Sequence, residues 1–189
     1  MENIIKKLIC TYENVLTNRM CDNIINKFNN CNNTNNTSNK DSNFSYYTIN
    51  NKSSDFNQWK EIDDIICKII GEHTMLYNKY CNDTIDQFTY NQFQDNGYTI
   101  YKYYKNTGFQ NFKHDFEWNH LGAAMVSFIF FLNTIEEDGE LEFINGVKIT
   151  PKKGNLILYP ATWDMMYKHN MSKNQDKYTI VGKLYYRDK

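Results

Sequence analysis

The residues of this chain that could do chemistry fall into two short segments of its C-terminal half. The first is Lys113-His114-Asp115, with Glu117 and His120 close behind it. The second is Tyr167-Lys168-His169, followed by Lys177. Imidazoles and carboxylates are the ligands of mononuclear non-haem iron sites, which take a His-x-Asp/Glu pair and a distant His on one face. These two segments are therefore the first place to look for a metal site.

Strand geometry limits which of these side chains can meet. Residues i and i+2 of a strand share a face and residue i+1 points away, so an inward Asp115 places Lys113 inward and His114 outward. A slip of one residue would turn His114 inward, but it would turn Asp115 outward and Phe116 inward. If Lys113 faces inward, we expect its ammonium to form an ion pair with Asp115, because a lone buried carboxylate would become neutral. A solvated surface lysine is the alternative.

The second segment leaves similar alternatives open. His169 has the same parity as Tyr167, but it lies two residues, roughly 7 Å, farther along a strand. Metal–nitrogen bonds of about 2.0–2.2 Å cannot absorb that displacement without a bulge. Tyr167 is either a core aromatic or a hydroxyl that joins Lys113 and Asp115. The possible displaced metal ligands are His114, His169, Glu117 and His120, the last two in an expected loop.

Strands must position these residues, because apolar residues recur with a period of two from Asp86 onward. Asn145-Gly146 predicts a tight hairpin between the strands on either side of it, and Asp95-Asn96-Gly97 predicts a turn. The predicted strands are 98–104, 123–132, 140–144, 147–149, 155–159 and 178–186. Many short strands after N-terminal helices indicate an α+β, jelly-roll-like fold.

The N-terminal half supplies the helices that support these strands. A strand is predicted at 8–15, and Thr17 is expected to cap a helix whose apolar residues recur at helical spacing. A long amphipathic helix is predicted from Asp55 to Tyr80, after a short strand at Phe44–Ile49. Between them, Asn29–Asn43 is nearly all Asn, Thr and Ser. It predicts a mobile loop within the domain, because it buries too little apolar area to offset its ordering.

Bulk properties exclude several classes of function. The 189 residues fit one domain. A net charge of −1 gives no basic field for nucleic acid or an anionic membrane. No signal peptide or transmembrane segment is expected, and five cysteines without C-x-x-C spacing suggest free thiols, so we expect an intracellular, reducing location. Abundant Asn, Lys, Ile and Tyr suggest an AT-rich genome such as that of a large DNA virus.

Two further stretches give the chain a family resemblance. They are Leu132-Asn133-Thr134-Ile135-Glu136-Glu137-Asp138-Gly139-Glu140-Leu141-Glu142-Phe143 and Lys148-Ile149-Thr150-Pro151-Lys152-Lys153-Gly154-Asn155-Leu156-Ile157-Leu158-Tyr159-Pro160. This frame resembles the prolyl 4-hydroxylase-like branch of the 2-oxoglutarate/Fe(II) dioxygenases. The resemblance implies a single domain over residues 1–189, with a double-stranded β-helix (jelly-roll or cupin-like) core and N-terminal buttressing helices.

The first half of the family motif reads R-Y-(x)3-G-(x)4-H-x-D-F. The chain matches it at Tyr104, Gly108, Asp115 and Phe116, and Lys113 stands where the family has its first histidine. The resemblance also implies that Tyr104 lines the 2-oxoglutarate pocket.

The second half of the family motif contains a histidine. Ten residues after it stands the Lys or Arg that binds the far carboxylate of 2-oxoglutarate. Counting back from Lys177 gives Tyr167, so the resemblance implies that Lys113, Asp115 and Tyr167 occupy the three metal positions. Lys177 would bind 2-oxoglutarate or another anion, although a strand-edge lysine that discourages aggregation is the alternative. Trp163 matches a family aromatic at the barrel mouth, with core packing as its favoured role.

With both iron histidines replaced, the favoured function is that of a non-catalytic binding or scaffold pseudoenzyme, with no cofactor held in the usual geometry. The alternative is an active 2-oxoglutarate-dependent hydroxylase of a protein or polymer side chain, with Fe(II) and 2-oxoglutarate held by displaced ligands. A structural subunit of an assembly is the second alternative. We expect a protein partner rather than a small molecule, and neither nucleic acid nor membrane.

Overall fold

Alternating apolar residues of the C-terminal half build a large antiparallel sheet. The computed structural model describes residues 4–32, 34–39, 42–50, 52–53, 55–85, 93–107 and 111–186. The helices in these ranges are α1 (Ile4–Lys7), α2 (Asn18–Asn29) and α3 (Phe56–Ile85). The strands are β1 (Cys10–Tyr12), β2 (Asn35–Asn39), β3 (Ser42–Ile49), β4 (Phe93–Tyr103), β5 (Trp118–Asn119), β6 (Gly122–Phe131), β7 (Leu141–Phe143), β8 (Lys148–Ile149), β9 (Leu156–Pro160), β10 (Tyr167–His169) and β11 (Lys177–Tyr186).

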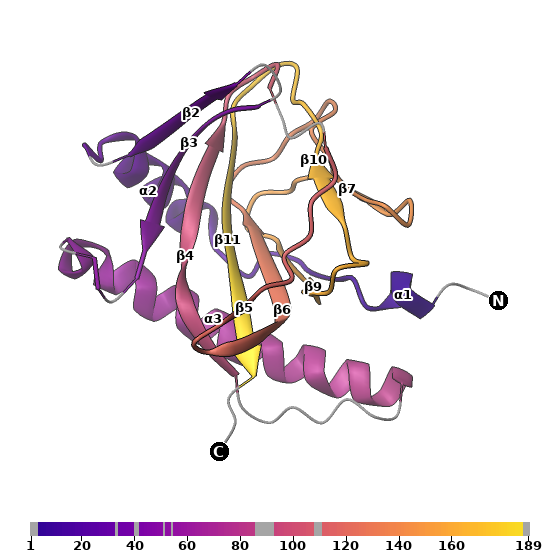
Figure 1. Ribbon diagram of the computed structural model, residues 1–189. Coiled ribbons are helices and arrows are strands. Elements are labelled where there is room, and N and C mark those ends of the chain that lie inside the picture. Colours follow the sequence, from indigo (N-terminus) through magenta and orange to yellow (C-terminus); the bar gives the residue numbers. More distant parts are fainter. Residues whose placement is uncertain are drawn as a thin grey trace.

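Two antiparallel sheets face each other. The large sheet has the order β1-β9-β6-β11-β4-β3-β2, with β5 paired to β6, and the small sheet has the order β10-β7-β8. Helices α2 and α3 lie on one side of the large sheet, and the small sheet lies on the other (Figure 1). This is the expected jelly-roll-like core with N-terminal helices against one face.

The N-terminal helices form where capping and apolar spacing predict them. The Thr17 side chain accepts a hydrogen bond from the Met20 backbone N–H, which caps α2. Cys21, Ile24 and Phe28 of α2 are buried. Helix α3 begins one residue after the predicted start and continues five residues beyond the predicted end. No helix among the described residues is long and apolar enough to cross a membrane.

The large sheet separates two clusters of buried residues. On the helix side, Trp59 and Ile66 of α3 pack with Ile100, Phe128 and other residues of the sheet. On the inner side, Ile129 and Phe131 of the large sheet pack with Leu141, Phe143, Ile157, Tyr159, Met165 and Tyr167. The inner side is where the candidate site lies.

The prediction of a loop over Asn29–Asn43 is wrong for Asn35–Asn39, which form strand β2. Residue 29 ends α2, residues 42 and 43 belong to β3, and residues 33, 40 and 41 lie outside the described part. The register pairs Asn35 with Tyr46, and the Ser45 hydroxyl donates to Asn36 Oδ1 over 2.5 Å. Strand β3 is the hydrogen-bonding partner of β2, and its Phe44, Tyr47 and Ile49 are buried. Strand β2 therefore needs little buried apolar area of its own.

Strand β4 runs through the turn predicted at Asp95-Asn96-Gly97. Its pairing with β11 shifts register there, from Gly182 opposite Tyr98 to Leu184 opposite Asp95. Gly97 has a φ of 83°, and its N–H donates to Asp95 Oδ1. The turn signal therefore marks a bulge inside a strand, a place where glycine supplies the positive φ that other residues avoid.

Candidate functional site

Backbone pairing brings the two chemistry-bearing segments together. The Lys113 N–H donates to the Tyr167 carbonyl, and the Tyr167 N–H donates to the Lys113 carbonyl, both over 2.8 Å. The two residues thus lie directly opposite each other as an antiparallel bridge. This register brings together the two residues that the family motif places at metal positions.

Asp115 is the buried carboxylate of the cluster, with 6% of its surface exposed. Its Oδ2 accepts a hydrogen bond from the Tyr159 hydroxyl at 2.6 Å, and its Oδ1 accepts one from the Tyr167 hydroxyl at 3.0 Å. Burial, with the adjacent Asp115 charge, raises the pKa of both tyrosines well above the ordinary value, so both remain protonated donors. Two phenolic hydrogen bonds therefore satisfy the carboxylate.

Lys113 is half-buried, and its Nζ lies 5.2 Å from the centre of the Tyr167 ring. Desolvation lowers the pKa of this lysine, the Asp115 charge opposes that shift, and Lys183 adds to it. Lys113 and Asp115 thus share the inner side, as the unslipped register requires. The expected ion pair between them stays a prediction, and the hydrogen bonds that Asp115 accepts come from Tyr159 and Tyr167, of which only Tyr167 was predicted.

The fold of this chain matches those of several solved prolyl hydroxylases. A viral collagen prolyl hydroxylase from Paramecium Bursaria Chlorella virus-1, in complex with 2OG, matches with a TM-score of 0.65 and 13% identity over 94% of this chain and 95% of that one. The chain has the fold of the prolyl hydroxylase-like 2-oxoglutarate oxygenases. A Pseudomonas putida prolyl-4-hydroxylase matches with a TM-score of 0.62 and 12% identity over 98% of both chains.

A third structure with this oxygenase fold is a prolyl hydroxylase from Trichoplax adhaerens in complex with a hypoxia inducible factor oxygen degradation domain peptide fragment. It matches with a TM-score of 0.68 and 14% identity, over 97% of this chain and 87% of that one. No protein family model and no curated protein sequence matches the chain. The likeness therefore concerns the fold.

The side chains at the three positions that the family motif assigns to the metal do not fit an iron ion. A facial triad takes two neutral imidazoles and one carboxylate. Here an ammonium, which has no lone pair, replaces one imidazole, and a phenol with a raised pKa replaces the other. Asp115 is the single conventional ligand, and the hydrogen bonds from Tyr159 and Tyr167 already engage both of its oxygens.

Three of the four possible displaced ligands are exposed or engaged by other side chains. His114 and His120 are exposed, as expected for His114 from strand parity. The Glu117 carboxylate accepts hydrogen bonds from Lys183, Tyr185 and Asn119. Over the described part of the chain, no three His, Cys, Asp or Glu side chains form a group that could hold a metal.

His169, the fourth, is fully buried. Its ring stacks on Tyr103 with centroids 4.7 Å apart, and it meets the Tyr167 ring edge-on at 5.7 Å. Neither ring nitrogen has a hydrogen-bond partner among the described residues. Burial, together with the charges of Lys177 and Lys113, lowers the pKa of His169 well below its ordinary value, so the imidazole is neutral.

Lys177 is buried with 1% of its surface exposed. Its ammonium donates to the backbone carbonyls of Gly139 at 2.8 Å and Asn170 at 3.0 Å, and it lies 5.4 Å from the centre of the Tyr103 ring. Desolvation lowers its pKa to about 7, against a smaller opposing effect of Glu140. Lys177 is therefore not a solvated lysine at the edge of the sheet, because it is buried and its ammonium donates hydrogen bonds to two backbone carbonyls.

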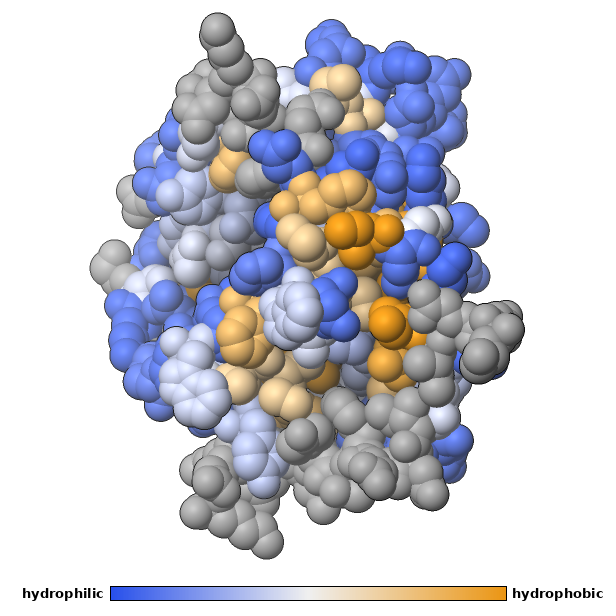
Figure 2. All heavy atoms as spheres, turned by 45° about the vertical axis from the view of Figure 1, so that its right-hand side comes forward, coloured by the Kyte–Doolittle hydropathy of each residue, from blue (hydrophilic) through white to orange (hydrophobic). Residues whose placement is uncertain are grey.

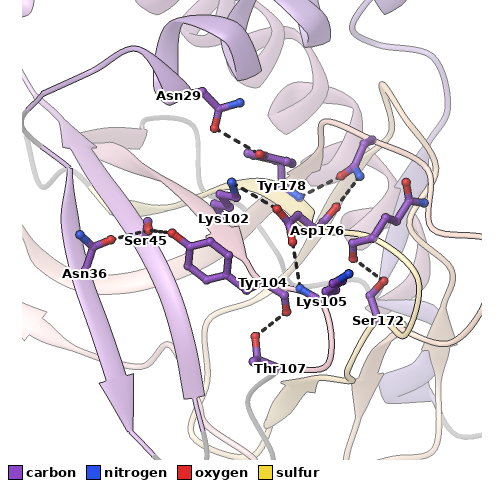
Figure 3. A network of polar contacts seen from close by, with 12 residues as sticks. Asn29, Asn36, Ser45, Lys102, Tyr104, Lys105, Thr107, Ser172, Asp176 and Tyr178 are labelled. Carbon is purple, nitrogen blue, oxygen red and sulfur yellow. Dashed lines mark hydrogen bonds and ion pairs between the residues drawn. The ribbon is translucent and has the colours of Figure 1, made fainter.

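Tyr104, which the resemblance places at the 2-oxoglutarate pocket, directs its hydroxyl toward strand β3. Its hydroxyl lies 2.6 Å from the Ser45 hydroxyl, and the Lys102 ammonium lies 5.0 Å from its ring centre. Lys102 also pairs with Asp176 at 3.2 Å, and Figure 3 shows Tyr104 pointing toward Ser45 within this network. Gly108 of the same motif lies outside the described residues.

The aromatic ring beside the Lys177 ammonium is that of Tyr103, which the match to the family motif did not identify. Register supplies the missing signal, because Tyr103 pairs directly with Lys177 across β4 and β11. Tyr159 was likewise missed as a partner of Asp115, although its strand was predicted. The core role favoured for Trp163 is wrong, because 71% of that residue is exposed.

Proposed function

We propose that this protein is a non-catalytic member of the oxygenase fold, a binding or scaffold module that holds no iron in its barrel. The observation that carries the proposal is the arrangement around Asp115. The one conventional ligand accepts hydrogen bonds from two tyrosines, and a lysine stands beside it. A divalent cation would have to displace both phenols and approach the Lys113 ammonium, which costs electrostatic free energy.

Anaerobic titration with Fe(II) and 2-oxoglutarate tests this proposal. We expect no visible charge-transfer band and no stoichiometric iron uptake in the native protein. A band at one equivalent of iron would instead support the active hydroxylase with displaced ligands. The search would then turn to a protein or polymer substrate.

A matched pair of variants tests the site itself. The double substitution Lys113→His with Tyr167→His restores two imidazoles opposite each other beside Asp115, and we expect it to gain iron binding. The same double variant with Asp115→Asn should gain much less, because it lacks the anionic ligand. Equal iron uptake by both variants would place the metal elsewhere and contradict the assignment of the three positions.

We further propose that the ligand of this module is a protein. Large apolar side chains are exposed at Trp118, Trp163, Phe116 and Ile144, with exposed fractions of 77%, 71%, 45% and 54%. Figure 2 shows apolar residues gathered near the centre of one face among hydrophilic ones. Aromatic residues of this kind are enriched at protein interfaces. Trp118→Ser with Trp163→Ser should weaken binding to a purified candidate partner, and Met75→Ser on α3, also exposed, should not.

A further inference from the structure

Helix α3, on the outer side of the large sheet, carries apolar side chains on both of its faces (Figure 1). Its inward face packs on the sheet through residues such as Trp59 and Ile66, which are 1% and 0% exposed. Its outward face carries Ile65, Met75 and Leu76, which are 38%, 75% and 56% exposed. Large apolar side chains that gather at the surface of one element indicate an interaction surface.

The charged residues on this outward face follow the same helical stripe as the apolar ones. Positions separated alternately by four and three residues lie along one side of an α-helix. Between residues 61 and 79 this spacing selects six exposed residues: Glu61, Ile65, Lys68, Glu72, Met75 and Lys79. Within the chain, Lys68 and Glu72 form an ion pair at 4.0 Å with side chains 75% and 59% exposed, so solvent screens it strongly.

This stripe is complementary to itself when it is read in the opposite direction. Three pairs of its residues stand at equal distances before and after Ile70, at two, five and nine residues: Lys68 and Glu72, Ile65 and Met75, and Glu61 and Lys79. In an antiparallel helix pair with a twofold axis at residue 70, the members of each pair face each other across the interface. Every layer of that interface would therefore join an acid to a base or one apolar side chain to another.

The same pattern excludes a parallel arrangement of two such stripes. A parallel twofold pair places each residue against its own copy, so Lys79 would face Lys79 and Glu61 would face Glu61, which is repulsive. A different protein would need a matching stripe of its own, whereas a second copy of this chain already carries one. Charge complementarity therefore identifies the occupant of this face.

We propose that two copies of this protein associate through the outward stripes of their α3 helices, antiparallel across a twofold axis near Ile70. Ile65 of each copy then packs on the partner's Met75, with the partner's Leu76 beside it, and Glu61 pairs with the partner's Lys79. Four of the six stripe positions are charged, so the dimer belongs to the transient class, which is less apolar than obligate dimers. This inference concerns a different face from the Asp115 cluster and does not depend on the proposed function.

Sedimentation velocity of the native protein at concentrations up to about 1 mM tests the inference. We expect a monomer–dimer equilibrium that added salt shifts toward the monomer, because salt screens the ion pairs across the interface. Lys79→Glu sets Glu61 against a second glutamate at both ends of the interface, and it should raise the dissociation constant at least about tenfold. Lys173→Glu, the same charge change at a lysine 68% exposed between β10 and β11, should leave the constant unchanged.

An exchange of charges tests the antiparallel orientation. Glu61→Lys combined with Lys79→Glu again sets an acid against a base, and it should return the dissociation constant to within about threefold of the native value. Both substituted side chains are exposed, so the variants should unfold at the native temperature, which thermal denaturation checks. A protein that stays monomeric at every concentration, a dimer that Lys79→Glu leaves intact, or an exchange that does not restore association would each overturn the proposal.

Discussion

The two faces of the large sheet bury different chemistry. On the helix side, Trp59, Ile66 and Phe128 belong to a cluster dominated by hydrocarbon and aromatic rings. On the inner side, Asp115, His169 and Lys177 are buried among tyrosines, with at most 6% of any of the three exposed. Buried ionisable groups cost free energy unless partners satisfy them. The comparison locates stability on the helix side and places the groups available for binding or chemistry on the inner side.

The inner face also shows how this fold satisfies a buried carboxylate with tyrosine hydroxyls. Tyrosine rings fill the space between the sheets, and their hydroxyls satisfy the carboxylate that remains. Backbone carbonyls satisfy Lys177 in the same way. Hydrogen bonds within the protein thus satisfy both Asp115 and Lys177.

The largest expected effect lies on the helix side. Trp59→Ala removes a ring that is 1% exposed and stacks on Tyr47 with centroids 5.4 Å apart. We expect a loss of about 3–5 kcal/mol in the free energy of unfolding. Trp163→Ala, at a 71% exposed position, should change it by less than about 0.5 kcal/mol. Urea denaturation of both variants checks the contrast, and equal losses would contradict it.

The next effect tests how tightly the helix-side core is packed. A Cβ atom at Gly182 would lie 2.2 Å from Phe128 Cζ, so Gly182→Ala forces that ring to move. We expect a cost of about 1–3 kcal/mol. Gly71→Ala on α3 meets no atom within 4 Å and should stabilise the protein by about 0.5–1 kcal/mol through helix propensity. Thermal unfolding should therefore move in opposite directions for the two variants.

A smaller effect is expected for Tyr159→Phe, which removes one of the two hydrogen bonds to Asp115. The loss should be about 1–2 kcal/mol, because the acceptor is charged and buried. Combining it with Asp115→Asn gives a double-mutant cycle. Additive losses in that cycle would show that the two side chains do not interact in solution.

The smallest expected effect is a pH dependence from His169. Its pKa in the folded protein is lowered well below the ordinary 6.5 by burial, so the unfolded chain binds the proton first as pH falls. Stability is full above pH 6.5 and is lost on acidification, with a slope of at most about 1.4 kcal/mol per pH unit. Denaturation between pH 7.5 and 5 should show a shallower slope for His169→Leu than for the native protein. An equal slope in the two proteins would contradict this role of His169.

The sequence by itself determined helices α2 and α3 and most strands. These follow from local rules, since Thr17 caps α2 and period-two apolar residues mark strands, whereas the assignment of Lys113, Asp115 and Tyr167 to one site is what the family resemblance implies. The same rules missed β10 and mistook β2 for a loop, because each depends on a partner strand far away in the chain.

Only the tertiary structure decides which hydroxyls donate hydrogen bonds to Asp115 and which aromatic ring lies beside Lys177. The sequence gives no means of predicting that Tyr159, 44 residues from Asp115, donates to it, or that Tyr103 rather than Tyr104 meets Lys177. Strand register sets the contact of Tyr103 with Lys177, and a shift of one residue would turn that side chain to the other face. Local pattern therefore fixed the positions of the candidate site, and long-range pairing fixed its chemistry.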